Sequence, residues 1–164
     1  MAVEGNAVEE TKCEIVEDAA KAGNHVMKLS WEAHSGSHVA ANLATPGAIL
    51  FREPGIYEIT AKVNVEQCPP EIQALAIRVV DSGNETFQYT TPIVNAGEPG
   101  WTELKWRVDT NAPLPDGSKS WGERVDGAMD FPVRFLGFGA GLKDWKTDGG
   151  TLLFDDISAT RVSD

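Results

Sequence analysis

The chain has 164 residues, of which 41% are hydrophobic and 24% charged, which is typical of a folded globular domain and not of a disordered segment. It carries 14 Lys and Arg against 25 Asp and Glu, a formal net charge of −11. Nucleic acids and anionic membranes need a cationic face, so this balance argues against both as partners, although a local basic patch is compatible with it. Neutral ligands and cations fit the balance more easily.

Short runs of alternating polar and apolar residues, separated by Gly and Pro turns, predict about eight to ten strands and no long helix. These runs cover residues 8–17, 25–31, 38–50 (one or two strands), 56–66, 73–81, 85–94, 101–109, 130–138 and 151–162. Loops are expected at 32–37 and 139–150, and the longest one at 110–129. We therefore expect one all-β domain over residues 1–164, an antiparallel β-sandwich.

The last strand places two carboxylates, Asp155 and Asp156, side by side in an apolar run. Strict alternation would turn one of them toward the core. A buried carboxylate must be paired, hydrogen-bonded or bound to a metal, and Ca²⁺ takes oxygen ligands of this kind. In the alternative, one Asp caps a neighbouring loop and the other is solvated. The residues alone leave both readings open.

Cys13 and Cys68 lie far apart without CxxC spacing, so a cysteine-based zinc site is not expected. A disulfide and two buried thiols both remain open. His34 and His38 stand four apart around Ser and Gly residues and not on a helix, which argues against zinc there as well.

The N-terminal residues do not begin a signal peptide, and no apolar run approaches the ~20 residues that span a bilayer. No GxSxG, P-loop or HExxH motif is present. A glycosidase needs two carboxylates that face each other across a cleft, whereas neighbouring residues of a strand point to opposite faces. The sequence therefore favours a binding role over catalysis.

Four stretches follow one another along most of the chain: AGNHVMKLSW, EPGIYEITAKVNV, the pair IRVVDSGN and GWTELKWRV, and LLFDDISATRV. In order and spacing they resemble the jelly-roll carbohydrate-binding modules grouped as families four, nine and twenty-two. The resemblance implies a non-catalytic, monomeric module that binds a polysaccharide or oligosaccharide. It also implies attachment to a secreted glycoside hydrolase or lyase, and thus an extracellular location once a signal peptide is removed.

The resemblance further implies a structural Ca²⁺ near the ends of the domain. In such modules one Asp of the terminal pair commonly contributes a ligand, joined by an N-terminal acid and by carbonyls of an early loop. The corresponding candidates in this sequence are Asp155, Asp156, Glu9, Glu10, Lys21 and Gly23.

A sugar site needs aromatic platforms for the apolar faces of the sugar and polar groups for its hydroxyls. Trp31 and Trp106 lie on apolar strand faces, so we expect them in the core, and Trp101 opens a strand and is also expected to be structural. Trp121 and Trp145 lie among charged and Gly residues in loops. They are candidate ligand platforms, or loop anchors folded back on the domain.

The polar candidates are Arg78, Gln88, Tyr89 and Arg134, on strands whose other face is apolar. Tyr89 is also a candidate for the core, and the two arginines could instead pair with surface acids. Two alternatives to the sugar-binding module remain open. One is a structural or adhesion jelly-roll domain without a ligand, and the other, weaker, is a small polysaccharide lyase that uses Tyr, His and Arg.

Overall fold

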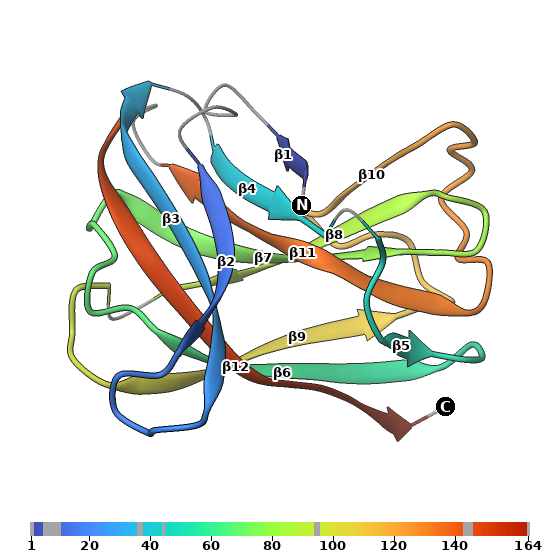
Figure 1. Cartoon of the computed structure of the whole chain (residues 1–164). Coiled ribbons are helices and arrows are strands. Elements are labelled where there is room, and N and C mark those ends of the chain that lie inside the picture. The colour runs from blue at the N-terminus through green and yellow to red at the C-terminus, as the bar shows by residue number, and fades with distance from the viewer. Residues whose placement is uncertain are drawn as a thin grey trace.

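In the computed structural model, two curled antiparallel sheets pack against each other, and no helix occurs in the described part of the chain (Figure 1). The structure describes residues 2–4, 11–35, 38–43, 45–93, 96–142 and 146–163. Within these ranges there is no helix of the length and apolarity needed to cross a membrane. The predicted all-β, antiparallel jelly-roll sandwich is confirmed.

One sheet has seven strands in the order β1-β4-β11-β7-β8-β10, with β5 pairing with β11 beside this path. In that order its strands are Ala2–Glu4 (β1), His38–Asn42 (β4), Val133–Leu142 (β11), Ile72–Val80 (β7), Thr86–Pro92 (β8), Lys119–Trp121 (β10) and Ile49–Phe51 (β5). Strand β10 lies inside the stretch predicted as the longest loop. The sequence did not predict this strand.

The other sheet has five strands in the order β2-β3-β12-β6-β9. They are Lys12–Glu17 (β2), His25–Ser35 (β3), Lys146–Ser163 (β12), Ile56–Asn64 (β6) and Trp101–Asp109 (β9). The expected turn between β2 and β3 is present, closed by a hydrogen bond from the backbone N–H of Asn24 to the carbonyl of Lys21 (3.0 Å).

Alternation along the strands builds the core between the two sheets. Ile59 and Val63 of β6 are fully buried, as are Ile77 and Val79 of β7. The sheets are joined by aromatic contacts. The ring of Phe138 in β11 stacks on that of Phe154 in β12, with centroids 3.9 Å apart and planes at 6°. Trp31 and Trp106 are buried in this core, as predicted.

Two predicted loops are wrong because strands continue through them. Strand β3 extends to Ser35, where it pairs with Lys146 of β12. Strand β11 extends to Leu142, and its pairing with β7 runs through Gly139 and Gly141. Glycine is disfavoured in strands and was read as loop, but the ladder of backbone hydrogen bonds to β7 holds these residues extended.

The expectation that Asp155 or Asp156 points into the core is also wrong. Leu152 and Phe154 face the core, so strict alternation would bury Asp156. Instead the register of β12 against β6 shifts after Asp155, and Asp156 has a positive φ of 50°. This bulge turns Asp156 to solvent and packs Ile157 against the core. Asp is among the residues that tolerate a positive φ.

The two cysteines are free thiols, Cys13 half-buried in β2 and Cys68 buried after β6. Burial disfavours the thiolate and raises the pKa of Cys13 to about 11 and that of Cys68 to about 12. The open choice between a disulfide and two thiols is thereby resolved toward thiols.

We expect Phe154→Ala to lower the free energy of unfolding by about 3–5 kcal/mol, because it removes a fully buried ring on which Phe138 stacks. Chemical denaturation measures the loss. Ile15→Ala is the control, since 64% of Ile15 is exposed, and it should change stability by less than about 0.5 kcal/mol. Equal losses in the two variants would contradict this description of the core.

Candidate functional site

A row of paired residues crosses the outer face of the seven-stranded sheet. Lys119 of β10 pairs with Gln88 of β8, Gln88 with Arg78 of β7, Arg78 with Gly137 of β11, and Gly137 with Asn42 of β4. Directly paired residues of antiparallel strands point to the same face. Because the neighbouring Ile77 and Val79 of β7 face the core, the whole row faces outward.

Arg78 is held in place by this row. Its Nε donates to Oε1 of Gln88 (2.9 Å), and its Nη1 donates to Oδ1 of Asn42 (3.2 Å). Its Nε lies 3.8 Å from the position that a Cβ would take at Gly139 of β11, so the lack of a side chain there leaves room for the guanidinium. The sequence predicted that Arg78 points outward. The structure adds that only 4% of it is exposed, so the guanidinium is fixed inside the surface.

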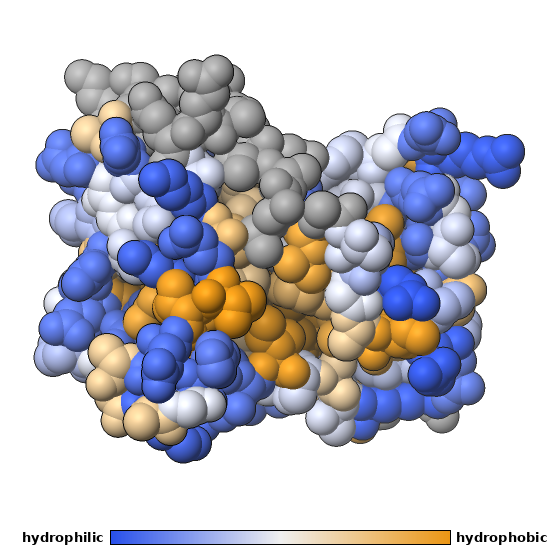
Figure 2. Space-filling view, viewed as in Figure 1, coloured by the Kyte–Doolittle hydropathy of each residue, from blue (hydrophilic) through white to orange (hydrophobic). Residues whose placement is uncertain are grey.

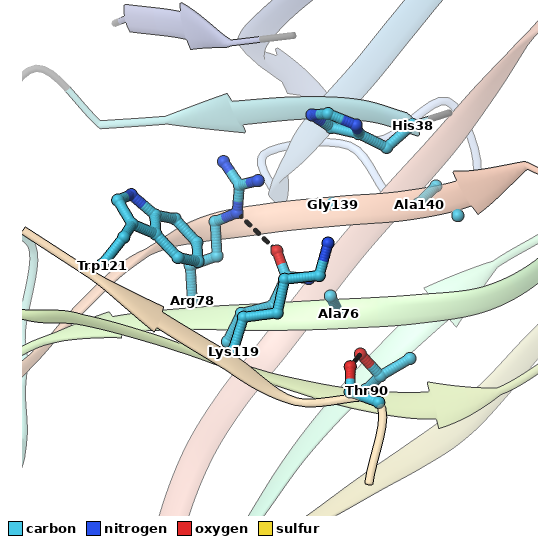
Figure 3. Close-up of a pocket in the computed structure, with 11 residues that line it drawn as sticks. His38, Ala76, Arg78, Thr90, Lys119, Trp121, Gly139 and Ala140 are labelled. Carbon is cyan, nitrogen blue, oxygen red and sulfur yellow. Dashed lines mark hydrogen bonds between the residues drawn. The ribbon is translucent and has the colours of Figure 1, made fainter. Parts of the chain in front are cut away.

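Around this row lies a cavity of about 400 Å³, within the range of small-ligand sites. It is lined by residues of β4, β7, β8, β11 and the segment that contains β10, namely His38, Ala76, Arg78, Gln88, Thr90, Gly117, Lys119, Trp121, Gly139, Ala140 and Gly141. Figure 3 shows the basic side chains of His38, Arg78 and Lys119 around the space above Gly139. In Figure 2 the surface is hollowed along its upper side, next to the loop that carries β10.

Trp121 forms one wall of the cavity. It is half-buried and comes from β10, where it pairs with Thr86 of β8. The Arg78 guanidinium carbon lies 5.1 Å from the centroid of its ring, which is a cation–π contact. Trp121 therefore lines the cavity and lies outside the buried core.

Two buried carboxylates, Asp81 and Glu85, anchor the long segment at 110–129 that contains β10. Glu85 is 2% exposed, and its Oε2 accepts a hydrogen bond from the backbone N–H of Asp126 (3.1 Å) and its Oε1 one from that of Gly127 (3.3 Å). Asp81 accepts from the N–H groups of Glu85 (2.8 Å) and Asp130 (3.0 Å). These bonds fix the return of the segment after Trp121.

The other predicted site residues lie elsewhere. Tyr89 faces the core at 4% exposure, the alternative placement given for it, and burial raises the pKa of its hydroxyl. Arg134 is exposed on the outward face of β11 but does not line the cavity, and its Nη1 donates to the carbonyl of Gly47 (3.4 Å). Trp145 lies outside the described residues.

Sequence reasoning missed His38, Thr90 and Lys119, which reach the cavity from three different strands. One signal could have located the cavity. Gly137, Gly139 and Gly141 recur at every second position, which in a strand places three bare positions on one face. The sequence pattern instead places Gly137 in the strand predicted at 130–138 and Gly139 and Gly141 in the loop predicted at 139–150.

Of the predicted metal ligands, Asp155 contacts the turn between β2 and β3 that carries Lys21 and Gly23, whereas Asp156 faces away from it. Oδ2 of Asp155 accepts a hydrogen bond from the side-chain amide of Asn24 (3.0 Å), and its Oδ1 accepts one from the backbone N–H of Asp156 (2.8 Å). The carboxylate of Asp156 turns the other way, to Nζ of Lys62 (2.6 Å). Both carboxylates thus accept hydrogen bonds from donor groups of the protein itself.

Lys21 and Gly23 lie in the turn between β2 and β3, where the backbone N–H of Gly23 donates to Oε1 of Glu17 (2.9 Å). Glu9 and Glu10 lie outside the described residues. Among the residues that are described, no group of three or more His, Cys, Asp or Glu side chains could hold a metal ion. Calcium stays a prediction of the resemblance.

Comparison with solved structures identifies the fold. The chain is similar to an arabinose-bound α-L-arabinofuranosidase at a TM-score of 0.60 and 15% identity, covering 96% of this chain and 23% of that one. It is also similar to the family 11 carbohydrate-binding module of the Clostridium thermocellum cellulase Lic26A-Cel5E, at a TM-score of 0.52 and 11% identity, covering 99% and 89%. A family 11 module from the same organism in complex with a β-1,3-1,4-mixed-linked tetrasaccharide has a TM-score of 0.51 and 11% identity, covering 94% and 84%.

The fold is therefore that of the jelly-roll carbohydrate-binding modules, as the sequence resemblance indicated. The chain spans less than a quarter of the arabinofuranosidase and most of the length of the two modules. No family model matches the sequence. No curated protein matches it either.

We expect Glu85→Gln to loosen the segment after Trp121, because one of its two accepting oxygens becomes an N–H₂ donor that faces backbone N–H groups. A buried donor or acceptor left unsatisfied costs about 1–3 kcal/mol. Hydrogen exchange should speed up at the amides of Asp126 and Gly127, which donate to Glu85. Glu123→Gln, an exposed change in the same segment, is the control. Unchanged exchange in Glu85→Gln would contradict the anchoring role.

Asn24→Ala should lower stability at neutral pH by about 1 kcal/mol, because Asp155 loses a hydrogen bond. The hydrogen bond from the Asn24 amide is the main interaction that holds the pKa of Asp155 below its usual value. A carboxylate with a lowered pKa stabilises the fold above its unfolded pKa, and this contribution is lost as the pH falls through the folded value. The difference between parent and variant should therefore shrink as the pH falls below about 4. A difference that is constant with pH would contradict this role of Asn24.

The same melts, repeated with EDTA and with excess calcium chloride, test the calcium prediction. A bound ion would raise the Tm of the parent by mass action and would not do so in Asp155→Ala. An identical Tm under both conditions would remove calcium from this fold.

Proposed function

We propose that this protein is a non-catalytic carbohydrate-binding module that binds a polysaccharide or oligosaccharide chain in the cavity on the outer face of its seven-stranded sheet. The main observation that supports this proposal is the cavity itself. It joins an aromatic wall, Trp121, to a fixed row of hydrogen-bonding side chains that includes Arg78 and Gln88. Sugars need this combination, because each ring has apolar C–H faces and a rim of hydroxyls.

The fold supports the proposal. Nearly the whole chain aligns in structure with two carbohydrate-binding modules, one of them in complex with a tetrasaccharide. By extension, we propose that the module acts in an extracellular protein as a monomer beside a glycoside hydrolase or lyase, which it brings to the glycan. The structure of an arabinofuranosidase that contains a similar region supports this arrangement.

The chemistry of the cavity supports a binding role. The described lining residues include no carboxylate, and glycosidases need a facing pair. The lyase alternative calls for a Tyr on the concave sheet, but the chain has two tyrosines, Tyr57 and Tyr89, and both are buried in the core. The second candidate function is the structural or adhesion domain without a ligand. It gains no support from the half-buried position of Trp121 at a cavity.

Affinity electrophoresis against soluble polysaccharides, followed by titration calorimetry, tests the proposal. Trp121→Ala should weaken binding by about 2 kcal/mol, roughly 30-fold, because it removes the aromatic wall. Trp101→Ala is the matched control, since Trp101 is also half-buried but begins β9 in the other sheet. It should leave the affinity unchanged.

The melting temperature of Trp121→Ala should stay near that of the parent, which separates loss of the wall from loss of the fold. Unchanged affinity in Trp121→Ala would place the site elsewhere. A parent protein that binds no glycan would support the structural-domain alternative.

A further inference from the structure

The cavity differs in charge from the rest of the molecule. Its described lining contains three ionisable side chains, His38, Arg78 and Lys119, and all three are basic. The chain as a whole has a formal net charge of −11. In an acidic protein, the cavity around Arg78 therefore carries the opposite sign.

The three side chains reach the same space from different strands. His38 comes from β4, Arg78 from β7 and Lys119 from β10, and Figure 3 shows them around the space above Gly139. Gly139 and Gly141 keep the floor free of side chains. A ligand group that enters the hollow is thus surrounded by nitrogen-bearing side chains on three sides.

Arg78 and Lys119 differ in a way that suits an anion. Arg78 is buried and held by Gln88, Asn42 and the ring of Trp121, so its position is set before a ligand arrives. Lys119 is exposed on the edge strand β10. A cleft lined by charges of one sign with low-dielectric walls concentrates the electric field and draws in ligands of the opposite sign.

We propose that the cavity is specific for an acidic sugar residue, in which a carboxylate or sulfate group of the glycan lies between Lys119 and Arg78 while Trp121 covers the ring. This inference rests on the proposed function and adds the class of glycan to it. Arg and Lys both bind such oxyanions through charge-assisted hydrogen bonds. General attraction of polyanions does not explain such binding, because the net charge of the protein opposes it.

The test titrates the parent protein with three soluble polymers: mixed-linked β-glucan as the neutral chain, polygalacturonate as the carboxylated chain, and carrageenan as the sulfated chain. We expect at least tenfold tighter binding to one of the acidic chains than to the neutral one. The preferred acidic chain identifies the anionic group. Binding should weaken as salt rises from low to 0.5 M, since screening reduces attraction between exposed charges.

Lys119→Gln removes one charge at the cavity, and Lys12→Gln removes one from the exposed face of β2 in the other sheet. The first should reduce affinity for the acidic chain about tenfold, and the second should leave it within about twofold of the parent. Lys119→Gln should reduce any affinity for the neutral chain much less than the affinity for the acidic chain, because glutamine keeps a hydrogen-bonding group at this position and loses only the charge. A structural defect would not produce this split, because it would weaken both kinds of binding.

The outcomes separate this inference from the proposed function. Binding to the neutral chain alone, or an acidic-chain affinity that Lys119→Gln does not reduce, would overturn the acidic-sugar inference and leave the sugar-binding proposal standing. No binding to any of the three chains would count against both.

Discussion

One face of strand β11 packs in the core and the other lines the cavity. Both the core and the cavity therefore depend on the alternation of side chains along this strand. Phe138 points inward and stacks on Phe154, which joins the two sheets. Gly137 and Gly139 point outward and carry no side chain. A Cβ at Gly137 would lie 2.1 Å from the carbonyl oxygen of Ala41, closer than any real contact. Any other residue there would push β4 away from β11.

The opposite wall of the cavity is built by a segment that has little regular structure of its own. Long irregular segments cost conformational entropy, so a fixed position needs compensating bonds. Here the compensation comes from the carboxylates of Asp81 and Glu85. Asp81 accepts from the backbone N–H of Glu85 across the β7–β8 turn and from that of Asp130, and Glu85 accepts from the N–H of Asp126 in the returning segment. The short β10 then pairs with β8 and sets Lys119 and Trp121 in register with the row on the sheet. The wall is therefore positioned by groups that do not line the cavity.

Much of the fold was predictable from the sequence because alternation reports burial directly. The strands around Ile59 and Ile77, the buried Trp106 and the outward Arg78 all follow from a period of two. Prediction failed where that period is interrupted or carries no side chain. The bulge at Asp156 resets the alternation of β12 within one residue, and no local composition marks it.

The cavity was less predictable, because its parts come from strands that only the topology brings together. Arg78, Gln88 and Trp121 were singled out and do meet there. His38 and Lys119 offered no signal beyond being polar, since β4 and β10 become neighbours of the site only through the order of the sheet. Tyr89 shows the converse. It lies one residue after Gln88, and the change of face along the strand places it in the core.

The net charge of the chain and the charge of its cavity act on a ligand at different distances. The net charge of −11 governs long-range behaviour and argues against a partner with an extended negative surface. A ligand in the cavity would lie at contact distance from its side chains, which outweigh charges beyond the screening length of about 10 Å at 0.1 M salt. In the proposed site, two cations would select the acidic sugar, Arg78 held by its hydrogen bonds and Lys119 exposed to solvent. Arg78 would orient the anionic group through its planar donors, and Lys119, exposed on a flexible stem, would follow it as a point charge. The surrounding negative surface would then favour a single acidic residue held in the hollow over indiscriminate coating by a polyanion, so that the net charge contributes to selectivity.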